Sequence, residues 1–436
     1  MSTVIEAAQK AKAASARLAG LTTDVKNRGL IQIAHALESH AREILAANHR
    51  DLDAARPLVE AGEMPEALFR RLKLDRAKLH DMVAGVRQVV ALDDPVGEIT
   101  YAMELDQNLQ LYRVNCPLGV VGVIFESRPD VLVQITALCF KSGNAVLLKG
   151  GREAEHTNRA LFEIIQTATV NADWPAEAMV LLERREDVNE MLAADGYVDL
   201  IIPRGSNALV RFVQENTNIP VLGHADGLCH LYVDRMADLE KAFVITEDAK
   251  LGYPAACNAV ETLLVHQDVA REFLPGIVNM LDANGVEVRA DERSRAALNN
   301  PNVTDATELD WRTEYCDLIL SIKVVDSLDE AIAHINTYGS RHTEAIITED
   351  AAAFERFFAE VDAAGVYWNA STRFADGFRY GFGAEVGIST AKLHPRGPVG
   401  LEGLVSYKYK LIGAGHTAIT YSGPDAKKFT HRRIDR

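Results

Sequence analysis

"GVVGVIFESRPDVLVQITALCFKSGNAVLLKG", residues 119–150, is the stretch that decides the fold class. Residues 119–126 and 144–150 are short continuous apolar runs, which are typical of strands covered on both faces. The residues between them, 129–143, have the pattern of a helix that ends at Gly143. A strand, a helix and a second strand in this order indicate a parallel, doubly wound sheet.

Alternating strand and helix patterns continue through most of the chain. The first series contains the strand-like residues 177–183, 198–205, 220–224 and 229–234. A second α/β series begins near Leu239 and contains the strand-like residues 259–266, 318–325, 344–348 and 365–370. The length of 436 residues fits two or three domains of roughly 150 residues each.

The ends of the chain have different patterns. Residues 1–93 repeat apolar positions at three- and four-residue intervals, which predicts helices. Residues 97–117 alternate and are rich in strand formers, which predicts a β-hairpin. The tail, residues 403–423, alternates again and could pair with this hairpin or with another subunit. Residues 374–398 are Gly-rich, and we expect a loop over a site there.

Charge and composition exclude several classes of function. A net charge of −16 argues against general binding to nucleic acids or membrane surfaces, because both are polyanionic. The sequence has no 18-residue uncharged apolar run and no signal-peptide pattern at its start. Its five scattered cysteines contain no C-x-x-C, which favours reduced thiols over a disulfide or zinc framework. We therefore expect a cytoplasmic enzyme without a metal site.

Cys257 is the strongest candidate for catalysis. It follows a Pro-Ala-Ala turn and precedes the strand-like residues 259–266, and catalytic groups are often found on such connections. Its small neighbours leave room for a substrate carbonyl. The Cys257 N–H and the adjacent Asn258 are candidate donors to a developing oxyanion. The competing interpretation is a buried structural cysteine, the commoner state of a free thiol.

The other cysteines are interpreted as structural. Cys139 and Cys316 lie in apolar segments. Cys229 stands next to His230, which allows a Cys–His pair, but it also opens a strand-like run, and the structural interpretation is favoured.

Two features suggest contacts with a phosphate-bearing cofactor. Neither a G-x-G-x-x-G fingerprint nor a P-loop occurs in its expected context. Lys149, however, stands at the end of a buried strand pattern. Gly205 and Ser206 stand at a strand-to-helix turn, where backbone N–H groups and the helix dipole can hold a phosphate. Each feature alone is weak, because Gly-Ser turns are also common helix caps.

Basic residues in turns are the third set of candidates. Arg128 and Arg204 directly follow buried-strand patterns and so point to the carboxyl ends of strands, where doubly wound folds bind ligands. Further candidates in the Gly-rich region are Arg373, Arg379, Lys392 and Arg396. A solvated surface cation is the default interpretation of each.

Six segments together resemble the aldehyde dehydrogenase superfamily, and within it the reductases that act on L-glutamyl 5-phosphate. They are residues 117–131, 141–151, 201–210, 251–259, 328–340 and 376–402. The last, "DGFRYGFGAEVGISTAKLHPRGPVGLE", is long and highly specific, and the resemblance covers essentially the whole chain.

The resemblance implies an α/β fold with a doubly wound cofactor domain, an α/β catalytic domain and a small β arm for oligomerisation. The expected boundaries are 1–98 and 117–230 for the NADP-binding domain, 231–395 for the catalytic domain, and 99–116 with 396–436 for the arm.

The resemblance also implies roles for individual residues. Cys257 matches the superfamily's nucleophile. Ser127 falls where aldehyde dehydrogenases usually carry an asparagine that helps to polarise the carbonyl. The implied cofactor contacts are Lys149 at the adenosine ribose and its phosphate, Gly205 and Ser206 near the pyrophosphate, and Glu314 at the nicotinamide ribose.

Two departures from the superfamily pattern are informative. Where hydrolytic members carry the glutamate that activates water, this sequence has Gly223, so a thioester would wait for another nucleophile, which fits phosphate. Where NAD-preferring members carry a glutamate that binds ribose hydroxyls, it has Arg152. A cation there suits a 2′-phosphate, which predicts NADP(H) over NAD(H).

These implications predict the NADPH-dependent reduction of L-glutamyl 5-phosphate to L-glutamate 5-semialdehyde through a Cys257 thioester, a step towards proline. Candidate ligands of the phosphate and α-carboxylate are Arg128, Arg204, Arg373 and Arg396, with His224 as a phosphate-site or acid/base residue. A separate glutamate 5-kinase would supply the acyl phosphate, and a homo-oligomer, dimer or tetramer, is expected. The alternatives are a hydrolytic aldehyde dehydrogenase for another semialdehyde and a catalytically silent scaffold.

Overall fold

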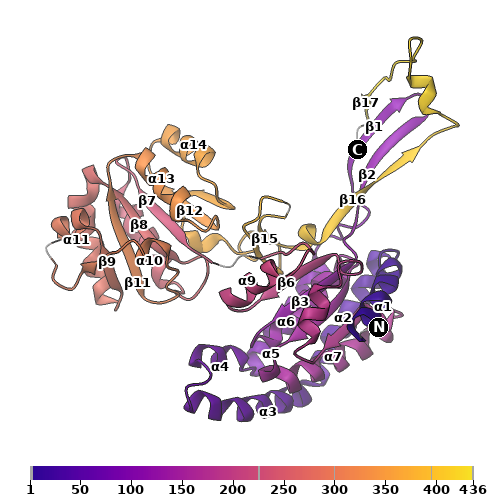
Figure 1. Cartoon of the computed structure of the whole chain (residues 1–436), viewed down its shortest axis with the longest axis horizontal. Helices are drawn as coiled ribbons and strands as arrows, with labels where there is room; N and C mark the ends of the chain where they lie inside the picture. The colour runs from indigo at the N-terminus through magenta and orange to yellow at the C-terminus, as the bar shows by residue number, and fades with distance from the viewer. Residues whose placement is uncertain (1–2, 224–225, 299, 394, 435–436) are drawn as a thin grey trace. The chain divides into compact units, whose positions relative to one another are not determined.

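The computed structural model describes residues 3–223, 226–298, 300–393 and 395–434. It divides into two compact units (Figure 1). The first comprises Met1–Leu222, Phe382–Gly387 and Val399–Arg436, and the second comprises Gly223–Gly381 and Ile388–Pro398.

The first unit is built on a parallel sheet with the strand order β5-β4-β3-β6. Its strands are β3 (Val120–Phe125), β4 (Ala145–Gly150), β5 (Met179–Leu182) and β6 (Leu200–Arg204). All six residues of β3 are buried, which confirms the prediction made from its continuous apolar run. Helix α6 (Pro129–Lys141) connects β3 to β4, and Gly143 follows it with φ +76°, a left-handed conformation that favours glycine after a helix.

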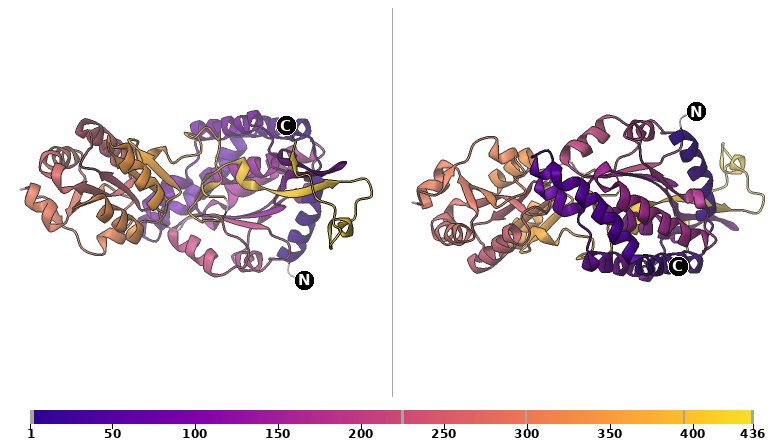
Figure 2. Two further views of the ribbon diagram at one scale, coloured as in Figure 1. Left: turned by 90° about the horizontal axis from the view of Figure 1, so that it is seen from above. Right: turned by 90° about the horizontal axis from the view of Figure 1, so that it is seen from below.

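Helices cover this sheet (Figure 2). Helices α2 (Thr23–Ser39), α3 (Ala41–Glu60), α5 (Arg76–Ala91) and α7 (Glu155–Val170) pack beside one another. The helical character predicted for residues 1–93 is confirmed within the described residues. The other helices of the unit are α1 (Thr3–Leu18), α4 (Glu66–Leu72), α8 (Asp187–Leu192) and α9 (Asn207–Glu215). Its short 3₁₀ turns are η1 (Arg152–Ala154), η2 (Ala176–Ala178), η5 (Leu401–Leu404) and η6 (Ala418–Tyr421).

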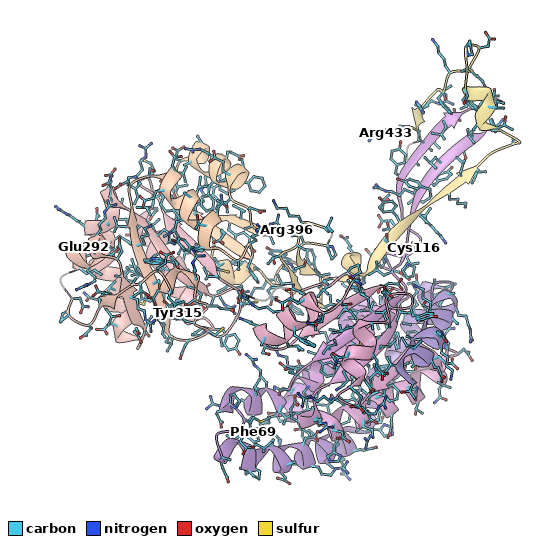
Figure 3. The ribbon with its side chains drawn as sticks, in the orientation of Figure 1. Phe69, Cys116, Glu292, Tyr315, Arg396 and Arg433 are labelled. Atoms are coloured by element: carbon cyan, nitrogen blue, oxygen red, sulfur yellow. The ribbon has the colours of Figure 1, made fainter. Side chains whose placement is uncertain are left out.

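A separate antiparallel sheet with the order β16-β2-β1-β17 forms an arm within the first unit (Figure 1). Its strands are β1 (Ile99–Asp106), β2 (Leu109–Pro117), β16 (Val405–Ile412) and β17 (Arg432–Arg433). The predicted hairpin is confirmed as β1–β2. The alternating tail pairs with it in the same chain: Cys116 lies opposite Ser406, and Arg433 opposite Met103 (Figure 3).

The second unit has a parallel sheet with the order β10-β9-β11-β8-β7-β12-β13 in its described residues. The strands are β7 (Cys229–Val233), β8 (Val260–His266), β9 (Glu287–Ala290), β10 (Thr304–Asp305), β11 (Ile319–Val325), β12 (Thr343–Ile347) and β13 (Gly365–Trp368). The helices are α10 (Leu239–Leu251), α11 (Gln267–Ala283), α12 (Glu292–Leu298), α13 (Leu328–Tyr338) and α14 (Ala351–Glu360), with 3₁₀ turns η3 (Asp310–Arg312) and η4 (Thr372–Phe374). Strands β14 (Gly387–Ser389) and β15 (Gly397–Val399) form a small sheet of their own.

Two details of the expected organisation are corrected. Residues 229–234 were expected in the first series, but β7 pairs with β8 and β12, so the units divide after Leu222 and not after residue 230. Of the strand expected at residues 220–224, the described residues 220–223 form one bridge, between Val221 and Ile201.

No helix in the described residues is both long and apolar enough to cross a membrane.

Candidate active site

Cys257 lies in the connection between α10 and β8, at the amino end of a fully buried strand. The turn is held by two backbone hydrogen bonds, from Ala256 N–H to Tyr253 O (3.1 Å) and from Ala259 N–H to Ala256 O (2.9 Å). The cysteine is half-buried, so its thiol is neither sealed in the core nor fully solvated. The predicted placement at the end of an element is confirmed.

Gly227 packs against the backbone of this turn, and the sequence analysis did not identify it. A Cβ atom on Gly227 would lie 2.3 Å from the Cys257 carbonyl oxygen and 2.6 Å from the Cys257 Cα. Real Cβ contacts do not reach such distances, and the obstacle is backbone, which cannot rotate away. Glycine at residue 227 therefore sets how closely the two segments approach. No side-chain pattern could have indicated this packing.

Cys229 and His230 do not form the pair that their adjacency allowed. The buried Cys229 thiol donates to the Cys257 carbonyl oxygen (3.4 Å), and burial raises its pKa well above the usual range. The His230 ring instead contacts the Glu344 carboxylate (3.0 Å), because alternate side chains of a strand point to opposite faces. These contacts agree with a structural role for Cys229.

Asn258 ties the Cys257 turn to the segment that carries Arg373. Its side-chain amide donates to the carbonyl oxygens of Ala375 (2.9 Å) and Arg373 (3.4 Å). The Thr372 hydroxyl donates in return to the Asn258 carbonyl oxygen (2.7 Å). Both amide hydrogens are thus engaged, and donation to an oxyanion would require one of these bonds to open. In this geometry the side chain of Asn258 positions η4.

Arg373, one of the predicted substrate arginines, packs against the loop that carries Cys257. It is half-buried, and its guanidinium lies 5.9 Å from the ring centre of Tyr253, in the same loop as the thiol. Burial, together with the nearby positive charge of Arg379, lowers the pKa of Arg373, and an electrostatic interaction with Cys257 opposes this. A partly desolvated guanidinium beside a thiol suits a thiolate and a phosphate, both anions.

Glu314 lies in the segment that leads from η3 to β11. The neighbouring Tyr315 (Figure 3) fixes this segment, since its hydroxyl contacts the Asp310 carboxylate (2.8 Å) and the Ser321 hydroxyl (2.7 Å). The expectation that Cys316 lies in an apolar segment is wrong. Cys316 is exposed and has φ +53°.

Four of the five predicted cofactor residues lie at one edge of the first unit's sheet, whereas Glu314 lies in the second unit. Strands β3, β4 and β6 are parallel and end at Phe125, Gly150 and Arg204. In the order β5-β4-β3-β6 the direction of winding reverses between β3 and β6. Open α/β sheets bind ligands beyond the carboxyl ends of their strands at such a switch point.

Gly150 ends β4, and Gly151 and Arg152 follow it; they line a small surface hollow that the carboxylates Glu155 and Glu183 also line. A Cβ atom on Gly150 would lie 2.2 Å from the Asn158 amide nitrogen, so glycine keeps this backbone close to its neighbours. Arg152 is exposed beside the hollow. Lys149 is buried, its ammonium donates to the Gly150 carbonyl oxygen (2.7 Å), and burial lowers its pKa.

Gly205 and Ser206 form the predicted turn into α9, and Ser206 is the helix N-cap. The Ser206 hydroxyl accepts from Leu209 N–H (3.3 Å), and the Ser206 N–H donates to the carboxylate of Glu126 (2.9 Å). Glu126 directly follows β3, so a protein carboxylate contacts the helix start at the switch point. A helix N-terminus favours negative charge.

Ser127 has φ +49°, which is uncommon for a residue other than glycine. Its N–H (2.6 Å) and hydroxyl (3.0 Å) both donate to the Glu153 carboxylate. Glu153 belongs to η1, so it links the ends of β3 and β4. Sequence reasoning missed both Glu126 and Glu153, because an acidic residue near an anion site has no distinguishing pattern.

The remaining candidates are placed as follows. Arg128 is the N-cap residue of α6, and Arg204 packs against Gly387, where a Cβ would lie 3.0 Å from its guanidinium. Arg396 (Figure 3) pairs with Asp362 (2.8 Å) in the second unit, and Lys392 contacts the same carboxylate (3.0 Å). The Arg396 guanidinium is therefore engaged by a protein carboxylate. The candidate His224 lies outside the described residues.

Comparison with known proteins places the chain in a family. Residues 1–305 match the model of the aldehyde dehydrogenase family. The gamma-glutamyl phosphate reductase of Nostoc punctiforme is 56% identical to this chain, over 99% of this chain and 98% of its own length. The gamma-glutamyl phosphate reductase of Synechococcus sp. (strain JA-2-3B'a(2-13)) is 60% identical, over 97% of this chain and 93% of its own length. The crystal structure of gamma-glutamyl phosphate reductase from Thermotoga maritima is 44% identical, covers 95% of this chain and 100% of its own, and has a TM-score of 0.92.

A more distant structure shares the fold alone. Glyceraldehyde-3-phosphate dehydrogenase from Methanocaldococcus jannaschii, complexed with NADP, is 17% identical over 94% of both chains, with a TM-score of 0.65. The predicted aldehyde-dehydrogenase-like α/β fold is thereby confirmed. The chain is an oxidoreductase of the aldehyde dehydrogenase family and belongs to its gamma-glutamyl phosphate reductases.

Proposed function

We propose that the protein catalyses the NADPH-dependent reduction of L-glutamyl 5-phosphate to L-glutamate 5-semialdehyde and phosphate, the second step of proline biosynthesis from glutamate. The observation that carries this proposal is the Cys257 turn with the half-buried Arg373 beside it. A guanidinium that interacts electrostatically with the Cys257 thiol suits acyl transfer from an acyl phosphate.

Cys257 acts as the nucleophile. Its thiolate attacks the acyl carbon of the substrate, the bond to the phosphate oxygen breaks, and a thioester remains. Arg373 stabilises the thiolate before the attack and the departing phosphate after it, since both carry negative charge. The Cys257 N–H is the candidate donor to the oxyanion that forms on the acyl carbon.

NADPH, when bound, supplies the hydride that reduces the thioester to a thiohemiacetal. Collapse of that adduct expels the Cys257 thiolate and releases the semialdehyde, which should cyclise spontaneously. The chemistry at the ends of β4 and β6 supports this cofactor: the exposed cation Arg152 follows β4, and Ser206 is the N-cap of α9. Lys149, Arg152, Gly205 and Ser206 would contact its phosphates and adenosine ribose, and Glu314 its nicotinamide ribose.

The proposal that the Cys257 thioester reacts with phosphate and not with water rests on Gly223. A glycine there cannot act as the base that activates water, so the thioester is left for phosphate in the reverse direction. This disfavours the alternative of a hydrolytic aldehyde dehydrogenase. Arg128, Arg204 and Arg396 remain candidates for the α-carboxylate.

The units take their roles from these residues: the first is proposed to bind NADPH and the second to supply the nucleophile. The arm is proposed to join subunits of a homo-oligomer, since β16 is an edge strand with exposed Tyr407, Tyr409 and Leu411. A separate glutamate 5-kinase would supply the labile acyl phosphate. Five free cysteines support a reducing, cytoplasmic compartment.

Cys257→Ser tests the proposal. Turnover of L-glutamyl 5-phosphate should fall to the background rate, while the thermal unfolding midpoint should stay that of the parent protein. Cys229→Ser is the comparison variant and should keep turnover, because the buried Cys229 thiol contacts the Cys257 carbonyl oxygen (3.4 Å) and the His342 ring (3.7 Å) and is not the proposed nucleophile. A Cys257→Ser enzyme with near-parental turnover would refute the nucleophile.

A further inference from the structure

Lys250 and Glu261 form an ion pair in the interior of the second unit. The Lys250 ammonium and the Glu261 carboxylate are 2.7 Å apart, and their side chains are 0% and 1% exposed. The ammonium also donates to the Val260 carbonyl oxygen (3.1 Å). Lys250 is in the last turn of α10 and Glu261 is the second residue of β8, so the pair closes the base of the loop that carries Cys257.

The second oxygen of the same carboxylate holds another segment. Glu261 Oε1 accepts a hydrogen bond from the Cys316 N–H (3.2 Å). Cys316 is in the left-handed region, a conformation that other residues than glycine adopt only when their surroundings impose it. Glu314, two residues earlier, lies near enough to raise the pKa of Glu261. One carboxylate therefore anchors both the Cys257 loop and the Glu314 segment.

The charges of the pair are costly for the fold. Burial raises the pKa of Glu261 to about 7, and the charge and hydrogen bond of Lys250 oppose this shift. A buried ion pair can often be replaced by apolar residues of similar volume with no loss of stability. Stability alone therefore gives little reason for two charges here, whereas directional hydrogen bonds to the Val260 carbonyl oxygen and the Cys316 N–H do.

We propose that Lys250 and Glu261 are positioning residues that fix the spacing between the Cys257 thiol and Glu314. The inference rests on the proposed roles of these two residues. Lys250 holds the amino-terminal base of the nucleophile loop, and Glu261 holds its carboxyl-terminal base together with the Cys316 backbone.

The test replaces both charges at once. Lys250→Met/Glu261→Met keeps the side-chain length and removes both charges, so no buried charge is left unpaired. The double variant should remain folded by thermal unfolding and circular dichroism. Its kcat should fall about 100-fold, the loss expected of a misplacement near 1 Å. NADPH binding, followed by fluorescence, should weaken about tenfold, as for one misplaced charge-assisted hydrogen bond. The rate of Cys257 alkylation by iodoacetamide should also change.

A second variant separates hydrogen bonding from folding. Lys250→Gln/Glu261→Gln is neutral but keeps an acceptor for the Cys316 N–H and a donor for the Val260 carbonyl oxygen. It should regain most of the kcat and NADPH affinity that the Met variant loses. If the Met variant does not fold, the Gln variant is compared with Lys250→Gln/Glu261→Met, which keeps a donor for the Val260 carbonyl oxygen, removes the acceptor for the Cys316 N–H and leaves no buried charge unpaired.

The first unit offers a matched control. Lys26 and Asp94 form another buried ion pair (2.8 Å, 1% and 7% exposed). Neither residue is among the predicted site residues. Lys26→Met/Asp94→Leu should leave Cys257 alkylation and NADPH binding unchanged.

The proposal is overturned if the folded Met variant keeps the parental kcat, NADPH affinity and alkylation rate, because the pair would then serve packing alone. It is also overturned if the Gln variant, with both hydrogen-bonding groups present, is as impaired as the Met variant. Alkylation and NADPH binding are measured without turnover. A changed alkylation rate together with weaker NADPH binding in the Met variant therefore supports the positioning role even if the substrate or the nucleophile of the proposed function is wrong.

Discussion

The Cys257 turn of the second unit (the nucleophile edge) and the predicted cofactor residues at the strand ends of the first unit (the cofactor edge) are held in different ways. In the second unit, contacts that involve the backbone define the Cys257 turn: Gly227 lies directly against it, and Asn258 binds the carbonyl oxygen of Ala375. In the first unit, carboxylates engage the predicted cofactor donors, as Glu126 does at the Ser206 N–H. The nucleophile edge is thus fixed by sterics and buried hydrogen bonds, and the cofactor edge by more exposed electrostatic contacts.

This difference predicts different kinds of sensitivity. A group fixed by buried contacts moves only if the packing changes, and small displacements then cost reaction rate. A donor engaged by a partly exposed carboxylate can exchange that partner for a ligand anion, and substitutions there change affinity by smaller amounts. The predictions below test the comparison from the largest expected effect to the smallest.

Gly227→Ala should give the largest effect. The new methyl group would overlap the Cys257 backbone and displace the nucleophile, so we expect a fall in kcat of about 100-fold. Stopped-flow turnover and thermal unfolding are the measurements. Gly85→Ala in α5 is the control, because its Cβ meets nothing within 4 Å and should leave kcat unchanged. Equal kcat values for the two variants would contradict the fixed geometry of this edge.

Arg373→Gln should have the second largest effect. Loss of a charge-assisted contact of about 2 kcal/mol lowers kcat/KM for the acyl phosphate about 30-fold. Cys257 alkylation at neutral pH should also slow, because a neighbouring positive charge that favours the thiolate is lost. The exposed Arg271→Gln on α11 is the comparison variant. If Arg373→Gln kept both rates, Arg373 would be a structural residue.

Arg152→Glu should shift cofactor preference at the other edge. Exchange of an exposed cation for an anion should lower the ratio of NADPH to NADH affinity about tenfold. Direct binding of each cofactor, followed by fluorescence, gives the ratio without turnover. An unchanged ratio would place the 2′-phosphate away from residue 152.

Glu126→Gln should have the smallest effect, and it should strengthen NADPH binding, whereas the substitutions above weaken binding or slow the reaction. Removal of a negative charge from the start of α9 should tighten NADPH binding two- to fivefold, the range of about 0.3–1 kcal/mol for a charge at a helix terminus. The gain should fade in high salt, since exposed charges are screened. Weaker binding would instead mean that Glu126 positions the Gly205-Ser206 turn for the cofactor.

The fold could be predicted further than the site. Continuous apolar runs such as 120–125 identified buried strands, because only strands covered on both faces have that pattern. Strand partners are less predictable: β7 was assigned to the first series, although it pairs with β8 in the second sheet. Periodicity describes a segment's own structure and says nothing about which sheet it joins.

At the site, the sequence predicted the position of Cys257 but not what holds it. Gly227 matters through a close backbone approach, and Glu261 through burial between segments distant in sequence. Neither property leaves a local pattern. The placement of Arg396 beside Asp362 could not be predicted for the same reason, because ion-pair partners depend on tertiary packing.

The central claim is that Cys257 exchanges its acyl group with phosphate and not with water. The direct measurement is NADPH formation from glutamate 5-semialdehyde and NADP⁺ as a function of phosphate concentration. The rate after the first turnover should be near zero without phosphate and should rise to saturation as phosphate is added. Steady NADPH formation that is independent of phosphate would contradict the account and identify a hydrolytic enzyme.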